Sequence, residues 1–231
     1  WDRDIGDLAK RFGVPAAVAQ RMRPDEILEP LLAPALIDDA RDNLVRRGWA
    51  YEGFWRTTRP SGLFPGKFVR EHMMLSCNGS SAMVVAMGST GVRLDGYAVL
   101  FENQMFVFVA DSKSSNLSFG VLNLVTRLKA EVLDGLSLTR LADSSGSPVA
   151  APILLERVGD LSGDEAADRV TFEKLCTQSA LVGPEAVPDD VRHHLCRDIG
   201  PTAFANGGQL QRVMRAAASR ARGPPFGLAG R

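Results

Sequence analysis

The sequence has little of what marks a secreted, membrane-spanning or strongly charged protein. Its three cysteines, Cys77, Cys176 and Cys196, are odd in number and widely spaced, which indicates reduced thiols in a cytoplasmic setting. No apolar run approaches the ~20 residues that a helix needs to cross a bilayer, so we expect no membrane partner. Lys plus Arg and Asp plus Glu both number 27, and this balance creates no overall field that would attract nucleic acid or acidic lipid.

The sequence also lacks the signatures of common catalytic and cofactor sites. It contains no Gly-x-Ser-x-Gly, no phosphate-cradling glycine-rich loop and no dinucleotide fingerprint. His193-His194-Leu195-Cys196, with Cys176 as a further ligand, invites a metal interpretation. Neighbouring histidines point to different sides of a helix, however, and no Cys-x-x-Cys or His-Glu-x-x-His pattern accompanies them. We therefore predict a protein that is not an enzyme and that uses neither metal nor cofactor.

What the sequence does contain is a long β-rich region between residues 48 and 158. Short runs of β-branched, aromatic and apolar residues alternate there with Gly, Asn and Ser, the pattern of antiparallel strands joined by hairpins. The expected strands span 49–55, 68–76, 83–87, 92–101, 104–110, 121–133, 136–142 and 149–158. We expect turns at Asn78-Gly79 and Asp134-Gly135, a loop over a barrel mouth at 57–66 and a surface loop at 112–118. Pro152 favours an edge position for the last strand, because proline cannot donate to a ladder.

Both faces of the central strands are apolar. Tyr97, Val99 and Phe101 alternate with Ala98 and Leu100, whereas a sheet with one wet face alternates apolar with polar residues. The sheet is therefore covered on both sides or curls around a cavity, and the sequence leaves both a closed barrel and a strongly bent sheet open. A barrel of ~8 strands is wide enough for one small ligand. The expected lining, of which alternation turns about half inward, is Trp49, Tyr51, Trp55, Phe101, Met105, Phe106 and Phe108.

Helical patterns flank this β region on both sides. Residues 1–47 form a helical unit that ends in a connector helix at 34–47, with Gly48 as a left-handed stop. Residues 159–231 carry three helix patterns, at 165–176, 187–199 and 207–222, and a flexible tail. Arg212 and Arg215 on the last helix are candidate phosphate contacts. The predicted class is α+β: an N-terminal helix-turn-helix-like unit, an antiparallel β-meander or barrel-like domain at 48–158, and C-terminal helices. Because the chain begins with Trp1 and shows no signal peptide, we expect a fragment or processed form that lacks an upstream domain.

Residues 4–22 have the spacing of two short helices joined by a tight turn. Apolar and small residues at Ile5, Leu8, Ala9 and Phe12 share one helical face, and Gly13 suits the stop. Residues 8–14 resemble the helix-turn-helix of bacterial transcriptional regulators, in which a small residue precedes glycine by four positions. The resemblance implies a second helix that reads DNA, with contacts from Gln20, Arg21 and Arg23. The rest of that helix is mostly Ala, a departure from the family pattern, and an ordinary αα-hairpin is the alternative.

The opening of the meander carries a second resemblance. Gly53-Phe54-Trp55 resembles the start of lipocalin-like barrels, in which the tryptophan closes one end. Three functional hypotheses follow. The first is a homodimeric bacterial transcriptional regulator, or its C-terminal portion, that binds DNA through the helix-turn-helix and a small apolar ligand or partner protein through the β domain. The second is a lipocalin-like small-molecule binding module without DNA binding. The third is an oligomeric interaction domain whose apolar outer faces meet a second copy.

Overall fold

The computed structural model describes residues 32–77, 79, 81–111, 116–124, 129–214 and 219–220. The described residues form the helices α4 (Pro34–Arg47), α5 (Glu165–Leu175), α6 (Asp189–Leu195) and α7 (Pro201–Ala205), with short 3-10 helices η1 (Gly48–Ala50) and η2 (Pro184–Ala186). The strands are β1 (Gly53–Pro60), β2 (Phe68–Cys77), β3 (Met83–Ser89), β4 (Val92–Phe101), β5 (Gln104–Asp111), β6 (Asn116–Asn123), β7 (Val132–Arg140), β8 (Pro148–Gly159) and β9 (Leu181–Val182). The predicted helix-turn-helix at 4–22 lies outside the described residues.

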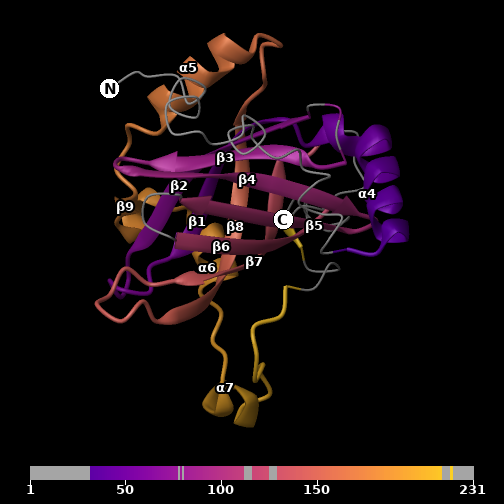
Figure 1. Cartoon of the computed structure of the whole chain (residues 1–231). Helices are drawn as coiled ribbons and strands as arrows, with labels where there is room; N and C mark the ends of the chain where they lie inside the picture. Colours follow the sequence, from indigo (N-terminus) through magenta and orange to yellow (C-terminus); the bar gives the residue numbers. More distant parts are fainter. Residues whose placement is uncertain are drawn as a thin grey trace, which may run out of the picture.

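Strands β1 to β8 form a closed antiparallel barrel in up-and-down order (Figure 1). Each strand pairs with the next, and β1 closes the ring by pairing with both β2 and β8. The short β9 adds only to the beginning of β2, opposite Phe68 and Val69. This closure decides between the barrel and the bent sheet, because each barrel strand pairs with a neighbour on both sides over at least part of its length. The α+β class with a barrel-like domain is therefore confirmed.

The predicted bounds of β6 and β7 are wrong. The expected loop at 112–118 includes the start of β6, and Asp134-Gly135, expected as a turn, lies inside β7 opposite Asn123 and Leu122. A Cβ at Gly135 would lie 2.0 Å from the carbonyl oxygen of Val121. Glycine is therefore required here because the two backbones approach closely, and a glycine within a strand often marks such an approach. The Asp-Gly pair is typical of hairpins, but here it lies within a strand whose backbone closely approaches that of β6.

The first and last strands also differ from the prediction. Trp49 and Ala50 belong to η1, and β1 begins only at Gly53, whose φ of +142° suits glycine. β8 is not an edge strand, because it pairs with β1 and β7. Pro152 is tolerated because β8 pairs with β1 only from Leu154 onward. At Pro152 the strand has a neighbour on one side only, which is the local condition that proline needs.

Helices α4, α5 and α6 pack on the outside of the barrel (Figure 1). α4 packs against β4, α5 against β2, and α6 against β8. The apolar clusters that seat them are Ala40 with Ala82 and Val99, Phe172 with Phe54 and Ala86, and Val191 and Leu195 with Phe68 and Leu154. Outward side chains of β5, β6 and β7 stay more exposed, among them Phe108, Leu117, Phe119, Val121 and Leu138. In the part of the chain that the structure describes, no helix combines the length and apolarity needed to cross a membrane.

Two predicted helix features are wrong. Gly48 has φ −53°, so α4 does not end in a left-handed residue but continues into η1. A side chain at Gly48 would bring Cβ to 2.8 Å from Leu44 Cδ1 and 2.9 Å from Cys77 Sγ, which explains the glycine by packing. The helix expected at 207–222 is absent from its described residues 207–214. Gly207, with φ +81°, instead ends α7 in a turn.

Candidate ligand-binding cavity

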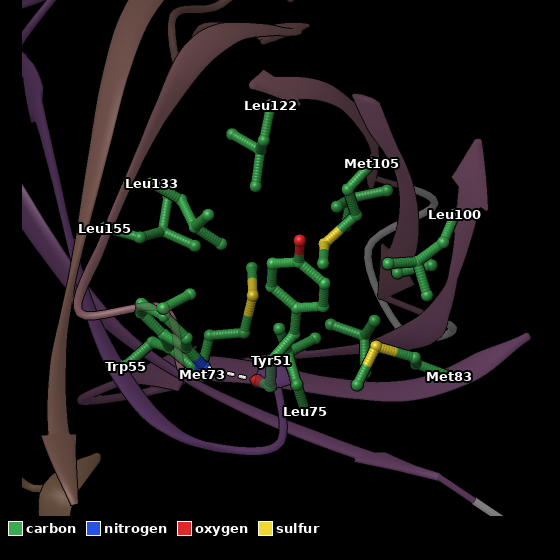
Figure 2. Packing of buried hydrophobic residues seen from close by; sticks show 14 of the residues in the cluster. Tyr51, Trp55, Met73, Leu75, Met83, Leu100, Met105, Leu122, Leu133 and Leu155 are labelled. Carbon is green, nitrogen blue, oxygen red and sulfur yellow. Dashed lines mark hydrogen bonds between the residues drawn. The ribbon is translucent and has the colours of Figure 1, made fainter. Parts of the chain in front are cut away.

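One end of the barrel, which we call the closed end, is filled by Tyr51, Trp55 and Arg157 together with apolar side chains. Tyr51 and Trp55 are both fully buried, and the Trp55 indole nitrogen donates to the Tyr51 carbonyl oxygen at 3.0 Å. Figure 2 shows the Tyr51 ring pointing into the middle of the core, among Met73, Met105 and Leu122. The Tyr51 hydroxyl accepts from Arg47 of α4 at 2.8 Å, so the helix outside and the core inside are joined.

Arg157 on β8 fixes η1 and the start of β1 to the closed end. Its guanidinium carbon lies 4.5 Å from the centre of the Trp55 ring, a cation–π contact. Its nitrogens donate to the carbonyl oxygens of Ala50 at 2.8 Å, of Ala130 at 2.6 Å and of Glu52. With only 5% of its side chain exposed, Arg157 works as a satisfied structural group, because the backbone carbonyls use its donors.

The opposite end of the barrel, which we call the open end, contains a cavity of about 240 Å³. This volume lies just below the ~300–1,000 Å³ typical of small-molecule sites. Its deep wall is apolar and consists of Met73, Met87, Leu94, Val107, Val109, Leu122, Ile153 and Leu155. These residues are inward-facing members of β2, β3, β4, β5, β6 and β8. The open end can therefore enclose an apolar group of modest size.

An ion pair lies inside the wall of this cavity. Arg59 Nη2 donates to Glu71 Oε2 at 3.1 Å, and their side chains are only 20% and 7% exposed. The two residues face inward because Thr57, between Trp55 and Arg59 on β1, pairs with Glu71 of β2. The Thr57 hydroxyl also lies 3.3 Å from the Glu71 backbone oxygen and nitrogen, which holds the register. The charges are therefore fixed where an enclosed molecule would meet them.

Hydroxyl and amide groups make up the rest of the polar lining. The hydroxyls of Ser118 and Thr139 are hydrogen-bonded to each other at 2.7 Å across β6 and β7. Asn116 contributes a side-chain oxygen that is buried and has no hydrogen-bond partner among the described residues. Buried polar atoms normally have partners, so Asn116 Oδ1 is a place where a bound molecule could donate a hydrogen bond.

Two hairpin loops meet over the mouth of the cavity. The β1–β2 loop contributes Ser61, Gly62 and Leu63, and the β7–β8 loop contributes Leu141 and Ala142. They touch, because a Cβ built on Gly62 would lie 2.6 Å from Leu141 Cδ2. Part of the loop expected at 57–66 thus lies over the barrel mouth, although Thr57 to Pro60 belong to β1.

The seven residues predicted to line a ligand site lie elsewhere in the fold, and none of them is on the wall of this cavity. Tyr51, Trp55 and Met105 face inward but fill the core at the closed end. Trp49 lies in η1 and is half exposed, and Phe101 packs toward the α4 cluster. Phe106 and Phe108 alternate with the inward Val107 and therefore face outward on β5, in edge-to-face contact with Phe101 and Phe119.

Of the predicted DNA contacts, only Arg212 lies in the described part of the chain; Gln20, Arg21, Arg23 and Arg215 lie outside it. Arg212 does not belong to a helix there. Its Nη2 donates to the carbonyl oxygens of Leu195 at 3.0 Å and of Arg197 at 2.6 Å. The side chain thus fastens its own segment to the end of α6.

A second polar cluster lies on the outer barrel wall around Asp134. This fully buried carboxylate accepts hydrogen bonds from Asn123, Ser219 and the backbone N–H of Arg220, and His194 Nε2 lies 2.9 Å away. Burial alone would raise the pKa of Asp134, but the bonds from His194, Ser219 and Asn123 outweigh it and lower the pKa. His194 and Ser219 bind the same carboxylate, so the serine is not set against the imidazole as a nucleophile requires. The cluster fastens residues 219–220 and α6 to β7.

The described residues show no group of three or more His, Cys, Asp or Glu side chains that could hold a metal ion. His193 is exposed on α6 while His194 is buried against Asp134, so the two point apart. All three cysteines are free thiols.

No protein-family model, curated protein or solved structure matches this chain. The geometry of the open end is therefore the main indication of what this chain binds. Arg59 and Glu71 were missed as site residues, although alternation places them on the same faces as the buried Trp55 of β1 and Met73 of β2, a signal that the sequence contains.

Proposed function

We propose that this chain is a small-molecule binding module whose barrel encloses an apolar ligand at the open end. The observation that carries the proposal is the cavity of about 240 Å³, with an apolar wall and a largely buried Arg59–Glu71 pair beside it. A few placed polar groups in an apolar concavity are the usual composition of a ligand site. The packing of Trp55 at the other end, beneath Arg157, agrees with the resemblance of Gly53-Phe54-Trp55 to lipocalin-like openings.

The test is titration of the full chain with N-phenyl-1-naphthylamine, a neutral probe that fluoresces in apolar surroundings. We expect saturable binding, and we expect Val109→Trp to weaken it at least tenfold, because Val109 lies on the cavity wall. The matched control is Val121→Trp, which makes the same replacement on the outer face of β6. Binding that is absent from the wild type, or equal in both variants, would contradict a site in the cavity.

A regulatory role is the second candidate, and the spacing of Ala9 and Gly13 in residues 8–14 favours it. In this proposal the ligand-binding barrel belongs to a transcriptional regulator that binds DNA through Gln20, Arg21 and Arg23. The chain should then retard DNA from its own promoter region, with an affinity that falls steeply with salt. Arg21→Ala with Arg23→Ala should abolish the shift, and retardation that survives in the double variant would remove this helix from the interface.

We also propose that a second copy of the chain covers the exposed outer face of β5 and β6. Outward positions on β5 and β6 carry Gln104, Phe106, Phe108, Ala110, Leu117, Phe119, Val121 and Asn123, none of them charged. An uncharged face can meet its own copy about a two-fold axis without repulsion, and exposed apolar patches mark interaction sites. Light scattering should give a dimer mass that Phe108→Glu reduces to the monomer and that Val45→Glu, on the far exposed side of α4, leaves unchanged. A monomer mass for the wild type would contradict the proposed dimer.

A further inference from the structure

The polar groups on the cavity wall have hydrogen-bonding capacity beyond what the protein uses. Arg59 has five N–H donors, and one of them, on Nη2, is bonded to Glu71 Oε2. Among the described residues, no hydrogen bond reaches the other carboxylate oxygen, Glu71 Oε1. Asn116 Oδ1 is likewise an acceptor that has no described donor. The wall thus offers both donors and acceptors close to an apolar space.

The charges of this pair cancel, and that decides which kind of polar group fits beside it. Glu71 is only 7% exposed, so a carboxylate brought into the cavity would lie near a like charge that water screens poorly. An ammonium group would likewise lie near the like charge of Arg59 and be repelled by it. A neutral group carries neither penalty, and a group with both an acceptor and a donor can bond to both members of the pair.

The other charged residue on the lining, Arg140, lies at the rim and is exposed. Water and salt screen its charge far more than they screen the inner pair. It can attract anions to the mouth, but it does not neutralise Glu71 within the cavity. Arg59 and Glu71 therefore determine which polar group of a ligand is accepted in the cavity.

We propose that the cavity selects a neutral apolar molecule whose polar end carries a carbonyl beside an N–H or O–H donor, with Arg59 donating to the carbonyl and Glu71 accepting from the donor. Amides, lactams and hydroxy-carbonyl compounds belong to this class. The inference rests on the proposed binding function and adds the chemistry of the ligand to it. Leaving either member of the pair unsatisfied beside a bound molecule weakens binding, which is how buried polar groups create specificity.

The experiment measures displacement of N-phenyl-1-naphthylamine from the full chain by octanamide, octanoate and octylamine at pH 7.5. These compounds share one apolar chain and differ in the charge of the head. For the wild type we expect octanamide to bind at least tenfold more tightly than either charged compound. Glu71→Gln removes the negative charge and leaves that of Arg59, so octanoate should gain at least tenfold and become the tightest of the three. Glu173→Gln, on the exposed outer side of α5, is the matched control and should keep the wild-type order.

A second variant provides a test that still applies if Glu71→Gln does not fold. Arg59→Gln with Glu71→Gln keeps the pair neutral and able to donate and accept, so octanamide should remain preferred. If the probe binds but octanoate equals octanamide in the wild type, or none of the three compounds displaces it, the ligand class is wrong while the binding module stands. If the probe itself does not bind, the proposed function fails and this inference fails with it.

Discussion

The two ends of the barrel each hold a buried or half-buried arginine, and they use it in opposite ways. At the closed end, Arg157 donates to three backbone carbonyls and to the Asp160 carboxylate, and its guanidinium carbon lies 4.5 Å from the centre of the Trp55 ring. At the open end, Arg59 makes one described hydrogen bond, to a carboxylate on the cavity wall. Arg157 therefore has a structural role, because its hydrogen bonds join the backbone segments that meet at the closed end. Arg59 is also positioned by the fold, but its remaining N–H donors have no described partner and can bond to a ligand.

This difference separates structural from functional polar groups in one protein. A buried ion pair adds little net stability, because the cost of removing both charges from water offsets their attraction. Stability therefore does not explain why the Arg59–Glu71 pair lies in an apolar cavity. Positions where a polar residue replaces the expected apolar one are often functional sites. The closed end obeys the rule for buried polar groups, since the donors of Arg157 have partners there.

The largest effect should come from the closed end, through Trp55→Ala. Trp55 is fully buried in the main core, so its truncation removes apolar contacts and leaves a large void. We expect a loss of about 3–5 kcal/mol in the free energy of unfolding, measured by urea denaturation followed by circular dichroism. Val109→Ala on the cavity wall is the matched truncation at the open end and should cost clearly less. Equal losses would show that the two ends do not differ in packing.

Arg157→Lys should follow, with a loss of about 3 kcal/mol. An ammonium cannot reach the carbonyl oxygens of Ala50, Glu52 and Ala130 together, and each buried carbonyl left without a donor costs about 1–3 kcal/mol. The same unfolding measurement checks it. A loss below about 1 kcal/mol would mean that Arg157 is replaceable and that the closed end does not depend on its geometry.

Cys77, an exposed thiol at the end of β2 beside the closed end, tests the influence of Glu52 and of the surrounding protein on a cysteine. Burial, followed by the charge and hydrogen bond of Glu52, raises the pKa of this thiol to about 12. At pH 8 its alkylation by iodoacetamide should be about a hundredfold slower than in the urea-unfolded chain, because so little thiolate is present, and it should quicken as pH rises toward 12. Peptide mass spectrometry gives the site-specific rate. Equal rates in the folded and unfolded chain would contradict the raised pKa of this thiol.

The smallest effect on stability is expected at the open end. Arg59→Met with Glu71→Leu replaces the ion pair by apolar side chains, and such replacements are often neutral or stabilising. We expect unfolding free energy to change by less than about 1 kcal/mol or to rise, while the preference for octanamide disappears. A loss of more than about 3 kcal/mol would make the pair a structural element and remove the contrast between the two ends.

The sequence predicted most of the barrel because alternation and hairpin signals are local. The strands predicted at 68–76, 92–101 and 104–110 match β2, β4 and β5 to within one residue, and α4 and α5 begin where their patterns indicated. Closure was left open, because pairing of β1 with β8 joins residues about 100 positions apart and no local pattern records it. The prediction at Asp134-Gly135 was wrong because the same two residues suit a turn and a strand that closely approaches its neighbour.

The site was harder to predict than the fold. Large side chains at positions 49, 51, 55, 101, 105, 106 and 108 were expected to line a ligand. Large side chains fill space, however, and Tyr51 and Trp55 do so at the closed end. The cavity instead opens where inward residues are smaller, such as Val107 and Val109, and where Arg59 and Glu71 replace apolar side chains. In this barrel, α4 and η1 place Tyr51 in the core and so fill the closed end. This packing joins separate elements, and local sequence patterns do not show it.

The most direct test of the account is a methyl NMR titration of the full chain with octanamide. We predict chemical-shift changes at Met87, Val107, Val109 and Ile153, which line the cavity. Methyl groups of Leu75, Leu100 and Leu133 in the core at the closed end should stay unchanged. Shifts confined to the outer residues Val121 and Leu138, or spread equally over both ends, would contradict the claim that the open end is built to hold a ligand.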